Sequence, residues 1–290
     1  MTFSSRWSPR PCVAIDIGGT KIDVAAVAAS GEILRRERMA TVGHEDLFAA
    51  VVTLARRLDF PDAQVIGVGC GGPMSMRTRT VSPLNIRQWR DFPLTSELAA
   101  AFSLPVFVDN DAKALALAEG TFGLAQGLDD FLSMVVSTGV GGGIVLDGRL
   151  LDGRDGNAGH IGHVVVVPDG RLCACGAHGC LEAEIAGPSI AAITGAPAEQ
   201  ADLDQRRRAG ALLGLAVGTV ASLLDLGNCF VAGSVALGFG APFFDAANES
   251  AHRVARIAHA RDVTIQPSGL GGDGPLLGAA VVGWRGAQGE

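Results

Sequence analysis

The feature that most constrains the fold is an apolar stretch that runs directly into a glycine-rich turn, and it occurs twice in the chain. The first stretch, CVAIDI at 12–17, contains one acid and leads into Gly18 and Gly19. The second, at 131–137, leads into the run TGVGGG at 138–143. Another apolar run follows each turn, so each half of the chain predicts a strand, a tight hairpin and a second strand. The repeated opening indicates two duplicated domains facing a cleft, with a boundary near 112–123.

The rest of the chain alternates strand-like and helix-like segments, which predicts an α/β fold. Short apolar runs that predict buried strands lie at 65–68, 105–108 and 229–232. Helices are predicted at about 45–58, 95–102 and 112–119, with Thr95 as the N-cap of the second. After the glycine run we expect the hairpin to resume as a strand at 144–146.

The composition excludes several classes of protein. The 290 residues are 48% hydrophobic, which is enough for one large core or two modest ones. The formal net charge of −7 argues against a broad nucleic-acid-binding surface. The first eleven residues contain no apolar core of a signal peptide, and the apolar run at 209–224 is shorter than a membrane span and is interrupted by glycines. We therefore expect a cytoplasmic protein with no membrane partner, in which Cys12, Cys70 and Cys229 are reduced core cysteines.

One histidine and three cysteines form the densest cluster of metal-binding side chains. His163 precedes Cys173, Cys175 and Cys180, with glycines between the last two thiols. This is a complete Cys₃His set for tetrahedral zinc, and glycines let the backbone fold tightly around an ion. The order and spacing differ from those of zinc fingers and ribbons, so the predicted zinc site is structural and need not serve nucleic acid.

Both glycine-rich turns are candidate phosphate-binding sites. The first, from Asp16 to Lys21, offers backbone N–H groups, a hydroxyl and a cation, and Asp16 can hold Mg²⁺ through water. The alternative for this turn taken alone is an ordinary glycine hairpin. The run from Ser137 to Gly143 is a second turn of the same kind, and two such turns in matching places favour nucleotide phosphates. Neither matches the Walker or the dinucleotide-binding pattern, which disfavours those folds.

Two further groups of polar side chains are candidates for chemistry. Asp109, Asn110 and Asp111 follow a predicted strand and open a predicted helix. A carboxylate there can accept the proton of an attacking hydroxyl, although Asp and Asn are also the preferred helix N-caps. His160 lies three residues before His163, so it either faces a ligand together with His163 and Glu182 or merely packs beside His163.

Together these motifs resemble the ROK family of sugar kinases, within the actin-like ATPase superfamily. The resemblance covers nearly the whole chain and rests on DIGGTK at 16–21, VDNDAKALALAEG at 108–120, STGVGGGI at 137–144, GHIGH at 159–163 and CACGAHGCLEA at 173–183. It implies a two-domain, ribonuclease H-like α/β fold with a cleft between the lobes. We expect an N-terminal lobe over 1–112, a C-terminal lobe over 113–290, and a last helix, about 275–286, that packs back on the N-terminal lobe.

The resemblance also implies roles for individual residues. Asp111 is the expected general base for the 6-hydroxyl of a hexose. The residues expected to line the sugar site are Gly71, Gly72, Asn85, Asn110, Asp111, His160, His163 and Glu182. Those expected to hold the ATP phosphates are Asp16, Gly18, Gly19, Thr20, Lys21, Ser137, Thr138, Gly139, Gly141 and Gly142, and Gly233 and Ser234 are expected near the adenosine. The zinc ligands are expected to be His163, Cys173, Cys175 and Cys180.

The chain departs from the family pattern at several points. Lys113 stands where the family commonly has Asn, and His160 stands where it usually has Glu. The segment around Gly233 is poorer in glycine than is usual, and the stretch at 188–209 is short. The change to His160 matters most, because a carboxylate accepts hydrogen bonds from two hydroxyls, whereas a neutral imidazole accepts one and donates one. Bacterial N-acetylmannosamine kinases of the family resemble the chain in carrying AGHIGH, at 158–163 here.

The predicted function is that of an ATP-dependent kinase acting on the 6-hydroxyl of glucose or N-acetylmannosamine, with Mg²⁺, structural zinc and a homodimeric assembly. The sequence leaves the sugar open, and also whether polyphosphate replaces ATP. One alternative is a sugar-sensing transcriptional regulator of the same family. It is disfavoured because only fifteen residues precede Asp16, too few for a helix-turn-helix. A zinc-dependent nucleic-acid module is a further alternative, which the acidic balance disfavours.

Overall fold

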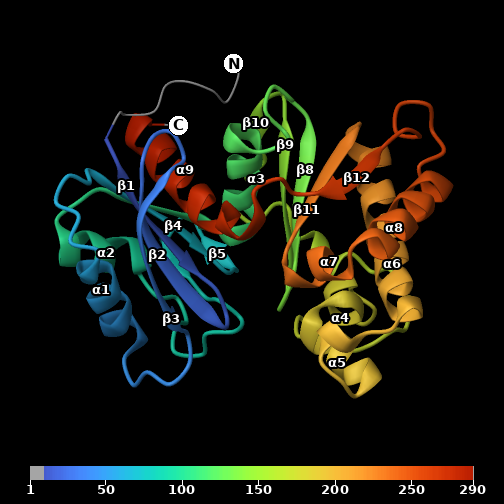
Figure 1. Cartoon of the computed structure of the whole chain (residues 1–290), viewed down its shortest axis with the longest axis horizontal. Helices are drawn as coiled ribbons and strands as arrows, with labels where there is room; N and C mark the ends of the chain where they lie inside the picture. Colours follow the sequence, from blue (N-terminus) through green and yellow to red (C-terminus); the bar gives the residue numbers. More distant parts are fainter. Residues whose placement is uncertain (1–9, 290) are drawn as a thin grey trace. The chain divides into compact units, whose positions relative to one another are not determined.

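The structure is a computed structural model that describes residues 10–289 (Figure 1). Most of the stretch examined for a signal peptide lies outside these residues. The described chain forms two compact units. The first, here the N-terminal unit, contains the chain up to Gln126, the segment Asp152–Ala158 and the chain from Gly272 onwards. The second, the C-terminal unit, contains Gly127–Leu151 and Gly159–Gly271.

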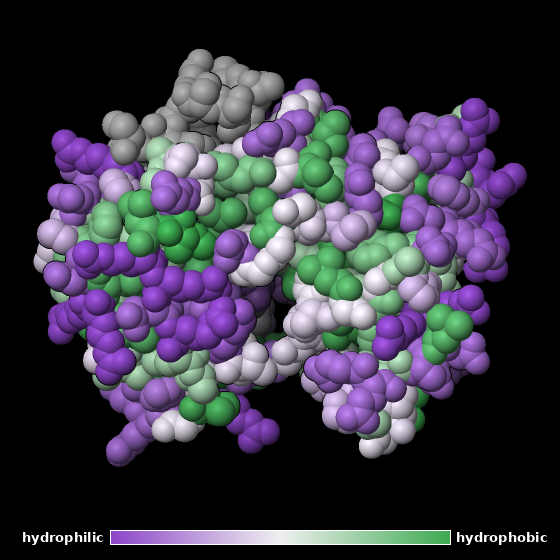
Figure 2. All heavy atoms as spheres, in the orientation of Figure 1, coloured by the Kyte–Doolittle hydropathy of each residue, from purple (hydrophilic) through white to green (hydrophobic). Residues whose placement is uncertain are grey.

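The N-terminal unit is built on a five-stranded mixed sheet of order β3-β2-β1-β4-β7. Its strands are β1 (Cys12–Ile17), β2 (Lys21–Val27), β3 (Ile33–Ala40), β4 (Val65–Cys70) and β7 (Val106–Asn110). β1, β2 and β3 pair antiparallel, whereas β4 and β7 run parallel to β1. β1 and β4 are buried along their whole length, which explains their continuous apolar sequences. The edge strand β3 is largely polar, and Figure 2 shows hydrophilic side chains gathered over this edge of the sheet.

The C-terminal unit repeats the same arrangement with a sheet of order β10-β9-β8-β11-β12. Its strands are β8 (Phe131–Val136), β9 (Val140–Leu146), β10 (Arg149–Leu150), β11 (Asn228–Ala232) and β12 (Thr264–Pro267). Here too the first pairs are antiparallel, and β11 and β12 run parallel to β8. The shared topology confirms the internal duplication that the repeated strand and turn predicted.

The glycine run of the second hairpin belongs to a strand, which corrects our expectation of a loop up to Gly143. β9 begins at Val140, and Gly141, Gly142 and Gly143 pair with the facing residues of β8. The turn itself is short because the Ser137 N–H donates to the Gly139 carbonyl (2.9 Å). The exposed part of this candidate phosphate site is therefore the turn Ser137–Gly139.

Two helices decide where the units divide. α3 (Asp111–Phe122) and α9 (Gly274–Gln288) pack against each other, and α9 also crosses β1, β4 and β7. Both therefore belong to the N-terminal unit. This differs from the boundary expected at 112/113, because α3 stays with the sheet that precedes it and the chain changes unit only after Gln126. The last helix lies where we expected it, on the N-terminal unit.

The remaining helices lie close to their predicted positions. In the N-terminal unit they are α1 (Leu47–Arg57) and α2 (Leu94–Phe102). The Asp46 carboxylate caps α1, but α2 begins after Pro93, so Thr95 lies inside the helix and is not its N-cap. The short strands β5 (Met74–Ser75) and β6 (Thr80–Val81) form a separate hairpin in the same unit.

The C-terminal unit contains the longest helix of the described chain. Its helices are α4 (Leu181–Ile185), α5 (Gly187–Thr194), α6 (Leu203–Leu224), α7 (Ser234–Phe239) and α8 (Ala241–Val254). By length and composition alone α6 could cross a membrane, and 44% of its most apolar window is buried within the structure. Small residues of α6 pack against α8, where a side chain at Gly214 would clash with the Ala247 carbonyl. The apolar sequence of α6 is thus explained by packing between helices.

Candidate active site and metal centre

Two carboxylates of the N-terminal unit face each other across β4. Asp16 lies near the end of β1, and Asp111 is the first residue of α3, directly after β7. Between them lies Gly69 of β4, where a side chain would begin 3.8 Å from Asp16 Oδ1 and 3.5 Å from Asp111 Cα. Because β1, β4 and β7 are parallel, their carboxyl ends meet at one edge of the sheet, and this edge brings together two residues predicted from separate motifs.

The environment of Asp16 opposes its ionisation. Burial, followed by the nearby charge of Asp111, raises the pKa of Asp16 to about 7, and Lys21 offsets only part of this effect. Both carboxylates would be stabilised by a cation between or beside them. Carboxylate oxygens are the ligands that Mg²⁺ prefers, so the pair fits the chemistry expected of Asp16.

The first glycine turn lies against the loop that carries Asn85. The Gly18 N–H donates to the Lys21 carbonyl and closes the turn (3.0 Å). Asn85 Cβ lies 2.8 Å from the point where a Gly19 side chain would begin, so only glycine allows this approach. The Lys21 ammonium, expected to reach phosphate, pairs here with Asp23 (3.1 Å).

The candidate sugar residues of the N-terminal unit lie together beside Asp111. The Leu84 N–H donates to the Gly72 carbonyl (3.2 Å), which joins the loop containing Asn85 to the glycine pair. Asp111 Oδ2 lies 4.0 Å from the point where a Gly71 side chain would begin. The structure thus collects Gly71, Gly72, Asn85 and Asp111 in one region.

The DND motif combines capping with a buried ion pair. The Asn110 side chain accepts from the N–H groups of Ala112 and Lys113, so Asn110 is the N-cap of α3. Asp109 pairs with the Lys113 ammonium (2.9 Å). Burial raises the pKa of Asp109, although Lys113 opposes this effect. The alternative role predicted for this motif, helix capping, is therefore carried out by Asn110. Asp111 lies in the first turn of α3 and faces Gly69 and Gly71.

In the C-terminal unit the candidate phosphate turn is held by polar contacts on both sides. The Ser137 and Ser234 hydroxyl oxygens are 3.0 Å apart, which joins the turn to the start of α7. The Val140 N–H donates to Glu182 Oε2 (2.9 Å). A side chain at Gly139 would begin only 2.8 Å from the same oxygen, so the Glu182 carboxylate would have to shift to make room for it. Glu182, expected at the sugar, therefore contacts the backbone of the candidate phosphate site.

The two histidines lie on and beside a short 3₁₀ helix, η1 (Ile161–His163). Their rings are nearly parallel, with centroids 6.1 Å apart. Ile161 packs at Gly142 of β9, and α4, which contains Glu182, packs against η1. His160, His163 and Glu182 thus belong to one region of the C-terminal unit.

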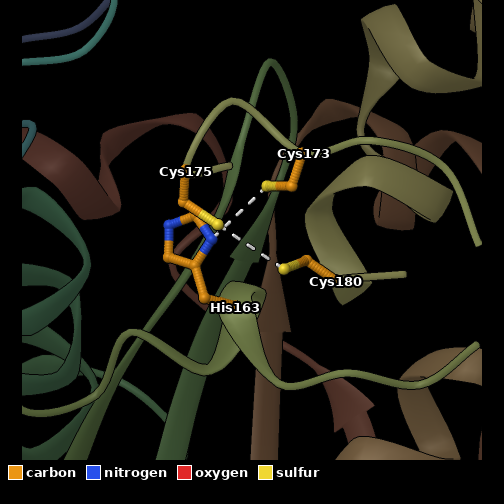
Figure 3. A group of neighbouring side chains, drawn as sticks. All are labelled: His163, Cys173, Cys175 and Cys180. Carbon is orange, nitrogen blue, oxygen red and sulfur yellow. Dashed lines mark hydrogen bonds between the residues drawn. The ribbon is translucent and has the colours of Figure 1, made fainter. Parts of the chain in front are cut away.

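The four predicted zinc ligands point toward a common centre (Figure 3). One ligand atom from each residue lies within 4.8 Å of all the others. Cys173 Sγ is 3.6 Å from His163 Nδ1, and Cys175 Sγ is 3.7 Å from Cys180 Sγ. Distances of this size match those between ligands around one tetrahedral zinc, which binds sulfur at about 2.3 Å and nitrogen at about 2.0 Å. The donor set therefore fits zinc.

The three thiols of the cluster also differ in pKa, because burial and hydrogen bonding act on them to different extents. Burial raises the pKa of Cys180 to about 12 and also raises the pKa of Cys173. A hydrogen bond from the backbone N–H of Ala177 lowers the pKa of Cys175. Three crowded thiols cannot all ionise without a nearby cation. A divalent metal that binds thiolates supplies that charge.

The structure shows two supporting residues that the sequence analysis missed. Glu184, which is buried, accepts from the Arg171 N–H (2.9 Å) and pairs with Arg208, and so holds the loop that leads to Cys173. One nitrogen of Arg90 donates to the carbonyls of Pro83, Ile86 and Trp89 and so holds the loop that carries Asn85. Glu184 could have been predicted as a buried, paired acid, because it lies within the largely apolar run LEAEIAG at 181–187. Nothing in the sequence around Arg90 indicates its role.

A match to a family model shows which protein family the chain belongs to. Residues 12–284 match the model described as the ROK family. The chain belongs to the ROK family. This confirms the resemblance inferred from the motifs.

The chain is similar to individual known proteins both in sequence and in structure. The chain is 39% identical over 61% of its length to a glucokinase of Thermotoga maritima and 41% identical over 63% to an N-acetylmannosamine kinase of Yersinia pestis. The aligned parts span 58% and 63% of those two relatives, about three fifths of each. A crystal structure of a ROK family glucokinase from Streptomyces griseus, in complex with glucose and AMPPNP, is similar with a TM-score of 0.83 and 31% identity, over 95% of this chain and 99% of that one. The two-domain, actin-like α/β fold predicted from the sequence is confirmed.

Proposed function

We propose that this ROK protein is an ATP-dependent hexose kinase that transfers the γ-phosphate to a sugar 6-hydroxyl. The observation that supports this most is the position of Asp111, directly across Gly69 from Asp16 and beside Gly71. The relatives named as glucokinases and N-acetylmannosamine kinases support the same reaction. A cytoplasmic homodimer is part of the proposal, and its assembly is testable by analytical ultracentrifugation.

In this proposal Asp111 is the general base. Its carboxylate accepts the proton of the 6-hydroxyl as that oxygen attacks phosphorus, and it orients the hydroxyl before the attack. Asn85 and the glycine pair 71–72 lie close enough to Asp111 to contact the same sugar. His163 and Glu182 of the C-terminal unit would contact other sugar hydroxyls.

The glycine turns would hold the phosphates of ATP. Gly19 and Gly139 have no side chain that would block an anion from their backbone N–H groups. Ser234 would lie near the adenosine, consistent with its contact with Ser137. Magnesium held through Asp16 would neutralise charge on the phosphates. Zinc held by the Cys₃His set would keep the loop before Glu182 in place.

The proposed substrates are glucose and N-acetylmannosamine, and His160 bears on the choice. A neutral imidazole can donate to the carbonyl oxygen of an acetamide group, which a carboxylate cannot do. This favours the N-acetylated sugar modestly, since one hydrogen bond contributes about 0.5–1.5 kcal/mol. A panel of hexoses and N-acetylhexosamines tests both preferences, with ADP release measured when ATP is the donor and formation of the phosphorylated sugar measured when polyphosphate is the donor.

The deciding experiment is the substitution Asp111→Asn. It keeps the shape and removes the base, so kcat should fall by at least about 10³-fold while the affinities for sugar and ATP stay within a few-fold. Binding is measured by calorimetry and turnover by ADP release. As a matched control, Asp204→Asn alters an acid in the first turn of α6 and should leave kcat unchanged. If Asp111→Asn keeps a tenth of the wild-type kcat but melts at a lower temperature, Asp111 only stabilises the helix.

A further inference from the structure

A lysine is buried at the start of α3, and nothing in the proposed reaction uses it. The side chain of Lys113 is only 1% exposed. Its ammonium lies 2.9 Å from Asp109 Oδ1 and 2.6 Å from Asp152 Oδ1, and it donates to the Gly156 carbonyl at 3.3 Å.

The positive charge of Lys113 does not stabilise α3. It is the third residue of the helix, where the helix dipole disfavours a positive charge. An ammonium is costly to remove from water unless carboxylates and further hydrogen bonds surround it. Asp109, Asp152 and the Gly156 carbonyl meet this requirement, and two of the three lie in another part of the chain. The lysine therefore connects α3 to that part.

The connected part is the segment Asp152–Ala158, here called the clamped segment. It belongs to the N-terminal unit, although the chain before and after it belongs to the C-terminal unit. The Ala158 N–H donates to the Asp152 carbonyl (3.0 Å), which closes the segment on itself. The Asn157 side chain accepts from the Met74 N–H (3.1 Å) and donates to the Met74 carbonyl (2.8 Å). Lys113 and Asn157 thus attach the segment at two points.

The clamped segment ends directly before Gly159, where the stretch with both histidines begins. We propose that Lys113 is a positioning residue whose ammonium fixes the clamped segment, and thereby the start of the stretch from Gly159 to His163, for sugar binding. This inference rests on the proposed function, because that function makes these histidines sugar ligands. Lys113 touches no substrate, and its effect passes through Asp152 and Gly156.

The test compares Lys113→Met, Asp152→Asn and the double variant. Asp152→Asn leaves the Lys113–Asp109 pair intact, so it remains informative if Lys113→Met folds poorly. Displacing the sugar ligands should lower kcat/KM for the sugar roughly ten- to hundredfold, mainly through KM, while KM for ATP stays within twofold. The double variant should lose no more than Lys113→Met alone, because both changes break the same contact.

Trypsin gives a readout that does not depend on activity. Arg154 lies in the clamped segment, and its side chain is 92% exposed. Cleavage after Arg154 should be slow in the wild-type protein and at least about tenfold faster in Asp152→Asn, because proteolysis follows the population of opened segment. Arg154→Gln is the matched control. It should remove this cleavage site and leave the kinetics of sugar phosphorylation unchanged.

The outcomes separate this inference from the proposed function. A wild-type protein that phosphorylates no hexose would refute the proposed function, and with it the role of Lys113 at the sugar. An active wild type whose Asp152→Asn variant keeps both its sugar KM and its resistance to trypsin would overturn the role of Lys113 alone. Faster cleavage with an unchanged sugar KM would also overturn it, since the lysine would then only stabilise the segment.

Discussion

Replacing Asp16 by Asn should make the protein more stable and inactive at the same time. Asp16 is buried near the end of β1, and burial together with the charge of Asp111 raises its pKa to about 7 from the usual 3.8. Above pH 7 the folded protein must therefore hold a carboxylate in a place that disfavours its charge. Asn has nearly the same shape and removes that charge, along with the group proposed to hold Mg²⁺.

The size of the effect follows from the change in pKa. A raised pKa means that the folded state binds the proton more tightly than the unfolded state, so ionisation of Asp16 destabilises the fold as pH rises from about 4 to about 7. The rise in pKa from 3.8 to about 7 means that ionisation of Asp16 lowers the free energy of unfolding by an amount on the order of 4 kcal/mol. Asp16→Asn should recover most of this at pH 8, a rise in Tm of about 8 °C or more, and much less at pH 5.

Asp23 provides a matched control with the opposite sign. It lies directly opposite Asp16 in the pairing of β1 with β2 and is also buried. Burial alone would raise the pKa of Asp23, but hydrogen bonds from Arg38, Arg36 and Lys21 hold it well below its usual range. A lowered pKa contributes stability above the unfolded pKa, near 4, and this contribution is lost as pH falls through the folded value. Asp23→Asn should therefore lower the Tm at pH 8.

The assay is thermal unfolding in buffers without added Mg²⁺, at pH 8 and pH 5, with turnover measured separately in Mg²⁺. Asp16→Asn is expected to melt above the wild type at pH 8, to converge towards it at pH 5, and to lose turnover. If Asp16→Asn melts at or below the wild-type temperature at pH 8, the carboxylate is not destabilised by its surroundings and the reasoning fails.

Three further predictions concern the C-terminal unit. Wild-type protein purified without chelators should contain about one zinc per chain by elemental analysis, and Cys175→Ala should lose that zinc and weaken sugar binding more than ATP binding; zinc-free wild type would contradict this. Glu182→Ala and Gly139→Ala should both weaken the binding of an ATP analogue, measured without sugar, by about tenfold, because each breaks the hydrogen bond from the Val140 N–H to the Glu182 carboxylate. Calorimetry that shows unchanged affinity in both variants would exclude a role of this hydrogen bond in ATP binding. His160→Glu should shift the ratio of kcat/KM towards glucose over N-acetylmannosamine by up to about tenfold, and an unchanged ratio would show that His160 does not contact the sugar.

Local sequence was sufficient for much of the fold. The apolar runs predicted β1, β4, β8 and β11 to within a residue or two, because buried parallel strands are apolar throughout. The repeated strand and turn predicted the duplication, since each half uses the same hairpin. The Cys₃His cluster was also predictable from the sequence, because its four members lie within eighteen positions of one another.

Contacts between distant parts of the chain were decided only by the tertiary structure. Lys113 and Asp152 are 39 residues apart, and Val140 and Glu182 are 42 apart, so no spacing rule links them. The boundary between the units moved past α3 because that helix packs on α9, from the other end of the chain. The raised pKa of Asp16 likewise depends on burial and on Asp111, which β4 brings alongside. Sequence records which groups are available, whereas dielectric surroundings and long-range partners exist only once the sheets have formed and the helices have packed on them.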